Sequence, residues 1–219
     1  MNGQDEGGLL QNLYYFIQQR NTSDWTTDPA MAIILSLITC GIYGFYVFYK
    51  LMDRRDQHFA RIANVVNTSV ALLKMKAQAS GNSQAITEEI AQLEFLQREI
   101  YEQSRERGAA LWLIIAIFTG IGALIGYYLI MDDFAKHDIA EAQFFTIMSQ
   151  ALTKIGRSQQ ASRALPTIPE RSFPVYLLLS IVTCGIFGFY WLYVLIDDGN
   201  GHFEAQVAWE DYIYAALSS

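Results

Sequence analysis

Residues 39–46 read Thr-Cys-Gly-Ile-Tyr-Gly-Phe-Tyr, and residues 183–190 read Thr-Cys-Gly-Ile-Phe-Gly-Phe-Tyr. These two copies stay in register without a gap, and a weaker middle copy aligns on Gly120-Ile121. All three copies end in an aspartate and a histidine five residues apart: Asp53 and His58, Asp132 and His137, and Asp197 and His202. A repeat of this kind predicts three structurally equivalent units.

Each copy includes a long stretch without Asp, Glu, Lys, Arg or His, at residues 30–49, 109–131 and 173–196. A helix of 20 residues or more reaches roughly 30 Å, the thickness of a bilayer core. Buried helices of a soluble protein are the alternative, but three such runs exceed the need of a small soluble core. We therefore expect an all-α integral membrane protein with three hydrophobic helices.

The polar segments between these runs predict further helices by their apolar spacing. Residues 53–108 are expected to form an extramembrane helical hairpin, with apolar stripes from Phe59 to Leu73 and from Ile86 to Ile100. The stripes are the expected contact surface for other subunits, with packing against each other as the alternative. The expected division of the chain is as follows: an N-terminal amphipathic segment at 1–28, membrane helices at 29–52, 109–131 and 173–196, the hairpin at 53–108, a helix plus linker at 132–172, and an amphipathic tail at 197–219. The N-terminal segment is expected to lie flat among lipid headgroups.

Single spans joined in series alternate in direction, which would place His58 and His202 on one side and His137 on the other. Basic residues crowd the first loop, so residues 53–108 are expected in the cytoplasm and the N-terminus outside. A competing topology breaks each run at its threonine and glycines, so that the chain dips in and returns with all three histidines together. Its arms of about ten residues are too short to cross the core twice.

Small residues inside the runs predict close helix packing in lipid, with a hinge or a ligand-facing backbone as the alternative. The candidate packing residues are Gly41, Gly44, Gly122, Gly126, Gly185 and Gly188. Cys40 and Cys184 occupy equivalent positions and are interpreted as small apolar helix residues; a thiol pair across packed helices is the alternative.

The Asp–His element is the one group of residues in this sequence whose side chains suit metal binding or proton transfer. Residues five apart on a continuous helix differ by about 140° of rotation, so the two side chains do not share a face. The candidate binding or interface residues are His58, His137, His202, Asp53, Asp132 and Asp197. A structural role at the interface is preferred for them; intersubunit or lipid-headgroup contact and metal or proton chemistry are the alternatives. We expect no catalytic residue, no metal ligand set and no cofactor.

The segments 35–46 and 180–191 resemble an uncharacterised bacterial membrane family, domain-of-unknown-function 4234, which carries Thr-x-Gly-Ile-Tyr-Gly-x-Tyr-Trp segments. The resemblance covers less than half of the chain and implies a membrane protein without assigning catalytic residues. The middle copy departs from the pattern, because Gly122-Ala123 replaces the aromatic-glycine pair.

The net charge of −7 argues against a nucleic-acid partner. We expect a non-enzymatic structural or assembly component of a bacterial cytoplasmic membrane, self-associating or bound to other membrane-protein subunits. One alternative is a small transport or cofactor-binding unit that uses the histidines. The other is a membrane-shaping protein with re-entrant segments.

Overall fold

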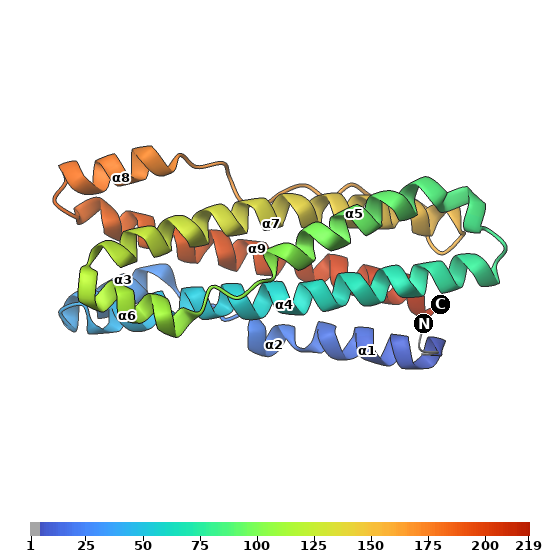
Figure 1. The fold of residues 1–219 in the computed structure, drawn as a ribbon, viewed down its shortest axis with the longest axis horizontal. Helices are drawn as coiled ribbons and strands as arrows, with labels where there is room; N and C mark the ends of the chain where they lie inside the picture. The colour runs from blue at the N-terminus through green and yellow to red at the C-terminus, as the bar shows by residue number, and fades with distance from the viewer. Residues whose placement is uncertain (1–4) are drawn as a thin grey trace.

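A computed structural model describes residues 5–219, which form helices and short connections without a β-strand. The expected all-helical class is confirmed. Three long helices form an elongated bundle, and shorter helices pack along it and at one end (Figure 1). The helices are α1 (Glu6–Gln18), α2 (Arg20–Ser23), α3 (Pro29–Ile38), α4 (Ile42–Ala79), the 3₁₀ turn η1 (Ser83–Ile86), α5 (Thr87–Gln103), α6 (Ala109–Thr119), α7 (Ile121–Lys154), α8 (Phe173–Val182) and α9 (Ile186–Ser218).

Each uncharged run is broken into two helices, so the prediction of continuous helices over 29–52, 109–131 and 173–196 is wrong. After α3, Cys40 and Gly41 both adopt positive φ angles, 50° and 93°. The amide of Gly41 donates to the carbonyl of Ser36 at 2.8 Å, and the amide of Cys40 to that of Leu37 at 3.2 Å. This is a Schellman ending, which stops the helix and turns the chain. The third copy repeats it at Cys184 and Gly185.

The threonine of each turn joins the two arms of the hairpin. The Thr39 hydroxyl donates to the carbonyl of Leu35 at 2.7 Å and accepts the amide of Tyr43 at 2.9 Å, which caps α4. Thr183 does the same for α9, and in the middle copy Thr119 accepts the amide of Gly122 at 3.0 Å. The middle turn is one residue shorter, because it passes directly from Thr119 to Gly120.

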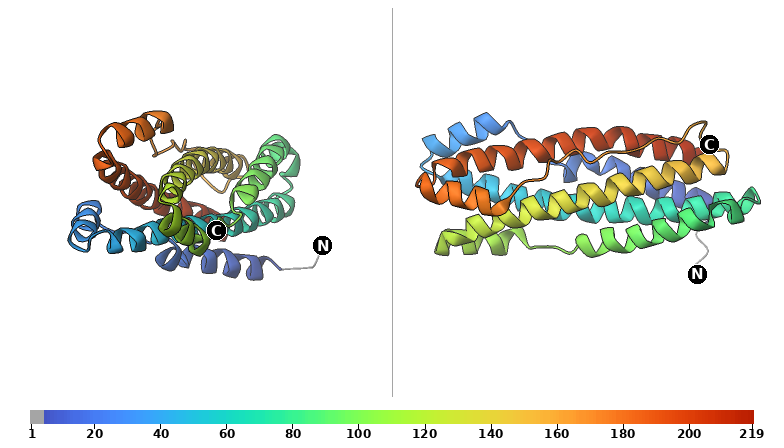
Figure 2. Two further views of the ribbon diagram at one scale, coloured as in Figure 1. Left: turned by 60° about the vertical axis from the view of Figure 1, so that its left-hand side comes forward. Right: turned by 90° about the horizontal axis from the view of Figure 1, so that it is seen from above.

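The hairpins α3–α4, α6–α7 and α8–α9 all lie at the same end of the molecule (Figure 1). The long helices α4, α7 and α9 start there and run parallel, as two further views show (Figure 2). The expected alternation of direction is therefore wrong, and the three histidines are not divided between two sides. The chain returns after α4 through α5, and after α7 through the extended segment 155–172.

The hairpin expected within residues 53–108 is present as the distal part of α4 and the antiparallel α5. Its apolar residues face the bundle: Leu93 and Ile100 are fully buried against α4 and α7. The helix expected near the N-terminus is also present, as α1. Its apolar face, including Leu13 and Ile17, packs on α4 and α9. That face is covered by protein, which contradicts the expected flat position among headgroups.

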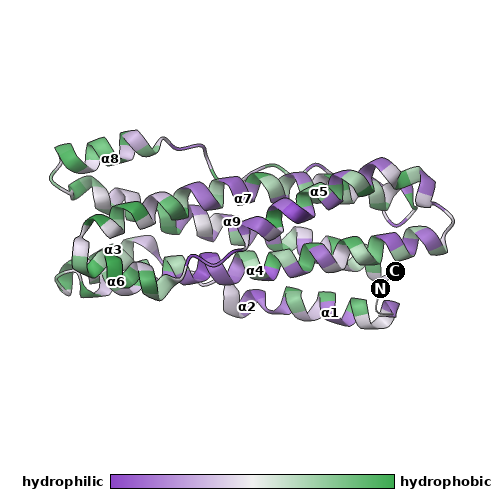
Figure 3. Ribbon diagram, in the orientation of Figure 1, coloured by the Kyte–Doolittle hydropathy of each residue, from purple (hydrophilic) through white to green (hydrophobic). Residues whose placement is uncertain are grey.

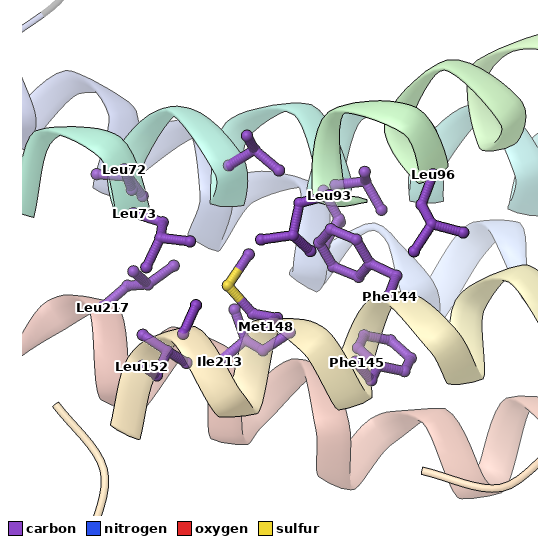
Figure 4. Close-up of a cluster of buried hydrophobic side chains, with 14 of the residues drawn as sticks. Leu72, Leu73, Leu93, Leu96, Phe144, Phe145, Met148, Leu152, Ile213 and Leu217 are labelled. Carbon is purple, nitrogen blue, oxygen red and sulfur yellow. The ribbon is translucent and has the colours of Figure 1, made fainter. Parts of the chain in front are cut away.

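Two apolar cores fill the bundle. The core far from the hairpins joins α1, α4, α5, α7 and α9, and contains Leu73, Leu93, Phe144, Met148 and Leu217 among its buried side chains (Figure 4). The core near the hairpins surrounds the fully buried Trp191. A layer of buried charged and polar side chains separates the two cores.

Apolar residues are concentrated at the hairpin end, and purple and green residues alternate along the remaining bundle (Figure 3). Among residues 5–219, no helix combines the length and apolar character needed to cross a bilayer.

Candidate functional site

The three repeat histidines meet in the centre of the polar layer. His58, His137 and His202 lie on α4, α7 and α9, each sixteen residues after the first residue of its helix. Because the helices are parallel and start at one end, equal spacing brings the side chains to one level. The side chains of His58 and His137 have no exposed area, and that of His202 is 3% exposed.

Glu141 completes the group, one helical turn after His137 on α7. The Nε2 atoms of His58 and His202 are 3.2 Å apart. Glu141 Oε2 lies 3.0 Å from His202 Nε2, and its Oε1 lies 3.5 Å from His137 Nε2. One ligand atom from each of the four residues falls within 4.8 Å of every other.

Each ring is oriented by an acceptor on its outer nitrogen. Nδ1 of His58 lies 2.8 Å from Asp24 Oδ1, and Nδ1 of His202 lies 2.9 Å from Asp138 Oδ1. Nδ1 of His137 lies 3.0 Å from Gln103 Oε1. An acceptor beside each Nδ1 favours a proton on that atom, so all three Nε2 atoms point into the centre, where those of the neutral rings carry lone pairs.

The inner atoms are not all satisfied. His137 Nε2 is buried and makes no hydrogen bond in the described part of the chain, and the only polar contact of Glu141 Oε2 there is its ion pair with His202. Gln206 donates its amide to Glu141 Oε1, which holds the carboxylate toward the histidines. Buried polar atoms without partners are uncommon, because burial then costs them their hydration.

Aromatic rings wall the group from solvent. Phe59 stacks on His137 with ring centroids 3.8 Å apart, and Phe203 lies 4.7 Å from His58. A small pocket of about 30 Å³ borders His202 and Glu141 and is also lined by Ala164, Leu165 and Thr167. The segment after α7 therefore contributes to the wall of this pocket.

Buried arginines complete the layer. Arg61 bridges Asp24 at 2.8 Å and also pairs with Glu210, which is 1% exposed. Arg55 pairs with Asp133 at 2.9 Å. Unpaired charges at these depths would be costly, so these bridges fix how the helices meet.

Electrostatics differ between the three rings. Burial lowers the pKa of His58 to about 4, and burial also lowers the pKa of His137. Burial lowers that of His202 too, but the Glu141 charge and the hydrogen bond to Asp138 outweigh it and raise the pKa to about 9. Burial opposes ionisation of Glu141, yet the adjacent His137 and His202 hold its pKa well below the usual value. The cluster therefore combines two neutral rings, one ring that favours charge and one carboxylate.

The repeat aspartates lie away from the centre. Asp53 pairs with Lys50 at 3.0 Å, Asp132 pairs with Lys136 at 2.7 Å, and Asp197 is exposed. The rotation argument against an Asp–His pair within one copy agrees with this placement. The conclusion that the histidines stay apart in the preferred topology is wrong, because the broken runs bring them together.

Sequence reasoning missed Glu141, Asp138, Asp24 and Gln103. The spacing His137-x-x-x-Glu141 places both side chains on one helix face and was a usable signal. Asp24 and Gln103 come from the loop before α3 and the end of α5, and nothing local in the sequence connects them to a histidine.

The candidate packing glycines divide into three groups. Gly41 and Gly185 are turn residues with φ of 93° and 91°. A Cβ on Gly126 would overlap the ring of Phe48 on α4, and one on Gly122 would lie 2.7 Å from the backbone of Ile115. The remaining two have room: a Cβ on Gly44 would meet Ser36 at 3.4 Å, and one on Gly188 would meet nothing within 4 Å.

Cys40 and Cys184 are free thiols at the exposed tips of two hairpins, and so are not interior helix residues. They have no disulfide between them. This corrects their interpretation as small apolar helix residues.

Comparison with curated proteins and comparison with solved structures each gave no match. A family model described as Domain of unknown function (DUF4234) matches residues 27–136 and 171–210, which is more than half of the chain. His58 and His202 lie within the matched residues, while His137 and Glu141 follow directly after the first matched segment. The chain therefore belongs to the DUF4234 family.

Proposed function

We propose that this protein is a structural membrane component that inserts its three hairpins into one leaflet of a bilayer and holds the helical bundle above it. The observation that carries the proposal is the concentration of apolar residues at the hairpin end (Figure 3), many of which have exposed side chains. At the three tips these include Ile38, Ile42, Phe118, Val182 and Ile186, which are 72%, 76%, 83%, 70% and 73% exposed. Contiguous apolar surface of this kind marks an interaction site.

Lipid is the occupant that the hairpins fit best. A ten-residue arm such as α3 is about 15 Å long, half of a 30 Å hydrocarbon core. Backbone groups in lipid need partners within the protein. The Schellman bonds and the threonine hydroxyls supply them at the turns, for example from Gly41 to Ser36 and from Thr39 to Leu35 and Tyr43.

Polar groups begin where the hairpins join the bundle. Lys50, Arg107 and Arg171 mark the bases of the three hairpins and pair with Asp53, Asp133 and Asp198. The amino group of Lys50 also lies 5.6 Å from the ring of Trp25, a residue type favoured at membrane interfaces. This border supports insertion to the depth of the arms. The basic residues favour a bundle on the cytoplasmic side of a bacterial membrane.

The proposal modifies the function expected from sequence. The stripes from Phe59 to Leu73 and from Ile86 to Ile100 were expected to contact other subunits, but their apolar residues pack largely inside this chain. The proposed contact surface in the membrane is therefore that of the three hairpins and not that of the two stripes. Three short hairpins that enter one leaflet also act as a wedge, which is the membrane-shaping alternative.

The test is vesicle flotation with a matched control. Ile38→Asp, Phe118→Asp and Val182→Asp together place a charge on each tip, and should abolish flotation with neutral phosphatidylcholine vesicles. The control Phe95→Asp, Tyr101→Asp and Leu165→Asp changes residues of similar exposure, 61%, 65% and 65%, away from the hairpins and should leave flotation intact. Equal loss in both variants, or flotation of the tip variant, would contradict the proposal.

Labels on the two native thiols report how deeply the hairpins enter the bilayer. Nitroxide labels on Cys40 and Cys184 should both show high oxygen accessibility and low accessibility to a polar nickel reagent in vesicles. Labels exposed to the polar reagent, together with a larger particle in solution, would instead identify the hairpin end as a contact between copies of this chain.

A further inference from the structure

We propose that His58, His137, His202 and Glu141 form a binding site for a divalent transition-metal ion, with Zn²⁺ as the best-fitting ion. Three imidazoles and one carboxylate are a donor set that zinc accepts in four-coordinate sites. This revises the expectation that the chain has no metal ligand set. The proposal does not depend on membrane insertion.

The distances suit a four-coordinate ion. Zn–N and Zn–O bonds of about 2.0–2.2 Å require ligand atoms roughly 3.3 Å apart in a tetrahedron. The closest inner pairs are 3.2 Å between His58 and His202, 3.0 Å between His202 and Glu141, and 3.5 Å between His137 and Glu141. A small movement of these side chains therefore closes the shell around an ion.

The outer contacts are those that a metal-bound histidine uses. Asp24, Gln103 and Asp138 accept from the three Nδ1 atoms, which leaves each Nε2 free to bind metal. The amide nitrogen of Gln103 lies 3.5 Å from Glu99 Oε1, which turns its oxygen toward His137. Random packing of three buried histidines would not supply a matching acceptor behind every ring.

The charges around the site also favour a divalent cation. One carboxylate in the inner group leaves a net charge of +1 on a bound Zn²⁺, and the outer carboxylates of Asp24 and Asp138 offset it. Arg61 stands behind Asp24 and is itself paired with Glu210. Among the described residues His137 Nε2 has no hydrogen-bond partner, and the Nε2 atoms of His58 and His202 lie only 3.2 Å apart.

The repeat explains why there are four ligands and not six. Positions four residues after the histidines are Ile62, Glu141 and Gln206 in the three copies. Only the middle copy supplies a carboxylate, and Gln206 donates to it. The site is enclosed by four protein ligands and aromatic rings, so its role is structural: it ties α4, α7 and α9 together at one level.

The competing explanation is that the four side chains share protons with one another and bind no metal ion. Metal-binding measurements distinguish the two explanations. The full-length chain, purified in mild detergent and stripped with a chelator, is loaded with Zn²⁺ or Co²⁺ and measured by elemental analysis and absorption. We expect one ion per chain, visible d–d bands typical of four-coordinate Co²⁺, and no retention of Mg²⁺. No retained Zn²⁺ and no Co²⁺ bands would overturn the proposal.

Variants assign the ligands. Glu141→Gln keeps the size of the side chain and should weaken Zn²⁺ binding at least tenfold, and His202→Asn should abolish the Co²⁺ bands. Gln103→Leu removes an outer acceptor and should weaken binding about 10- to 100-fold. Asp132→Asn changes a partly exposed carboxylate on the same helix as Glu141, is the matched control and should bind like the unmodified chain. Equal affinity in Glu141→Gln and Asp132→Asn would exclude this site even if the chain binds metal elsewhere.

The proposals of metal binding and of membrane insertion can be tested independently of each other. The charged tip variant should still bind one Zn²⁺ in detergent, and the stripped chain should still float with vesicles. Loss of ion binding in the tip variant despite native helix content would show that the site needs the hairpins in place, and would contradict the independence of the two proposals.

Discussion

Replacing Gly126 by alanine should destabilise the bundle, although alanine is the better helix former. A Cβ at this position would overlap the ring of Phe48, which is 2% exposed and packs between α4 and α7. Alanine in the helix interior contributes about 0.5–1 kcal/mol relative to glycine. Overpacking a well-filled core costs about 1–3 kcal/mol. The free energy of unfolding should therefore fall by up to about 2.5 kcal/mol, which is the difference of these two effects.

Two further variants test the cause. Gly188→Ala adds the same methyl group to a helix where it meets nothing within 4 Å, so it should stabilise the chain by about 0.5–1 kcal/mol. Phe48→Leu shortens the opposing side chain and should reduce the cost of Gly126→Ala in the double variant. The assay is urea unfolding of the detergent-solubilised chain, followed by helical circular dichroism. Equal stability of Gly126→Ala and Gly188→Ala, or an unchanged cost of Gly126→Ala in the Phe48→Leu background, would refute the reasoning.

Two other perturbations act on the turns and the buried charges. Thr39→Val removes the hydroxyl that donates to Leu35 and accepts from Tyr43, and should cost about 1–3 kcal/mol in the same unfolding assay, whereas Thr39→Ser should restore most of it. Burial raises the pKa of Glu210 to about 7 from 4.5, more than the charge of Arg61 lowers it. The folded state then binds the extra proton between these values, so the contribution of Glu210 to stability falls as pH rises from 4.5 through 7. Glu210→Gln should reduce the pH dependence of the free energy of unfolding between pH 4.5 and 7. An unchanged pH dependence would show that another group causes it.

The repeat and the apolar spacing were enough to predict the helical class and the hairpin formed by α4 and α5. The break in each apolar run was harder to predict, because a length of 20 residues or more favours one continuous helix. A positive φ at Cys40 or Cys184 is uncommon for a residue with a Cβ, and only the following glycine signals the turn. The candidate site depended on that break. Once the helices are parallel, His58, His137 and His202 must meet, but the acceptors Asp24 and Gln103 come from segments whose position only packing decides.

The turn reverses the chain direction within each copy, and this reversal brings the three histidines together. With a break in every run, each long helix points away from the hairpin end, and the chain must return before the next copy begins. The 23 residues of α7 after Met131 span about 35 Å as helix, and the 18 residues of 155–172 reach up to about 60 Å when extended, so the linker is long enough. The shorter middle turn does not displace its histidine, because the missing residue precedes the long helix. His137 therefore lies sixteen residues after the first residue of its helix, like His58 and His202. One residue inserted between a turn and its histidine would rotate that side chain by about 100° and shift it by about 1.5 Å, out of the cluster. The spacing between turn and histidine is therefore the feature that all three copies must share for the rings to meet.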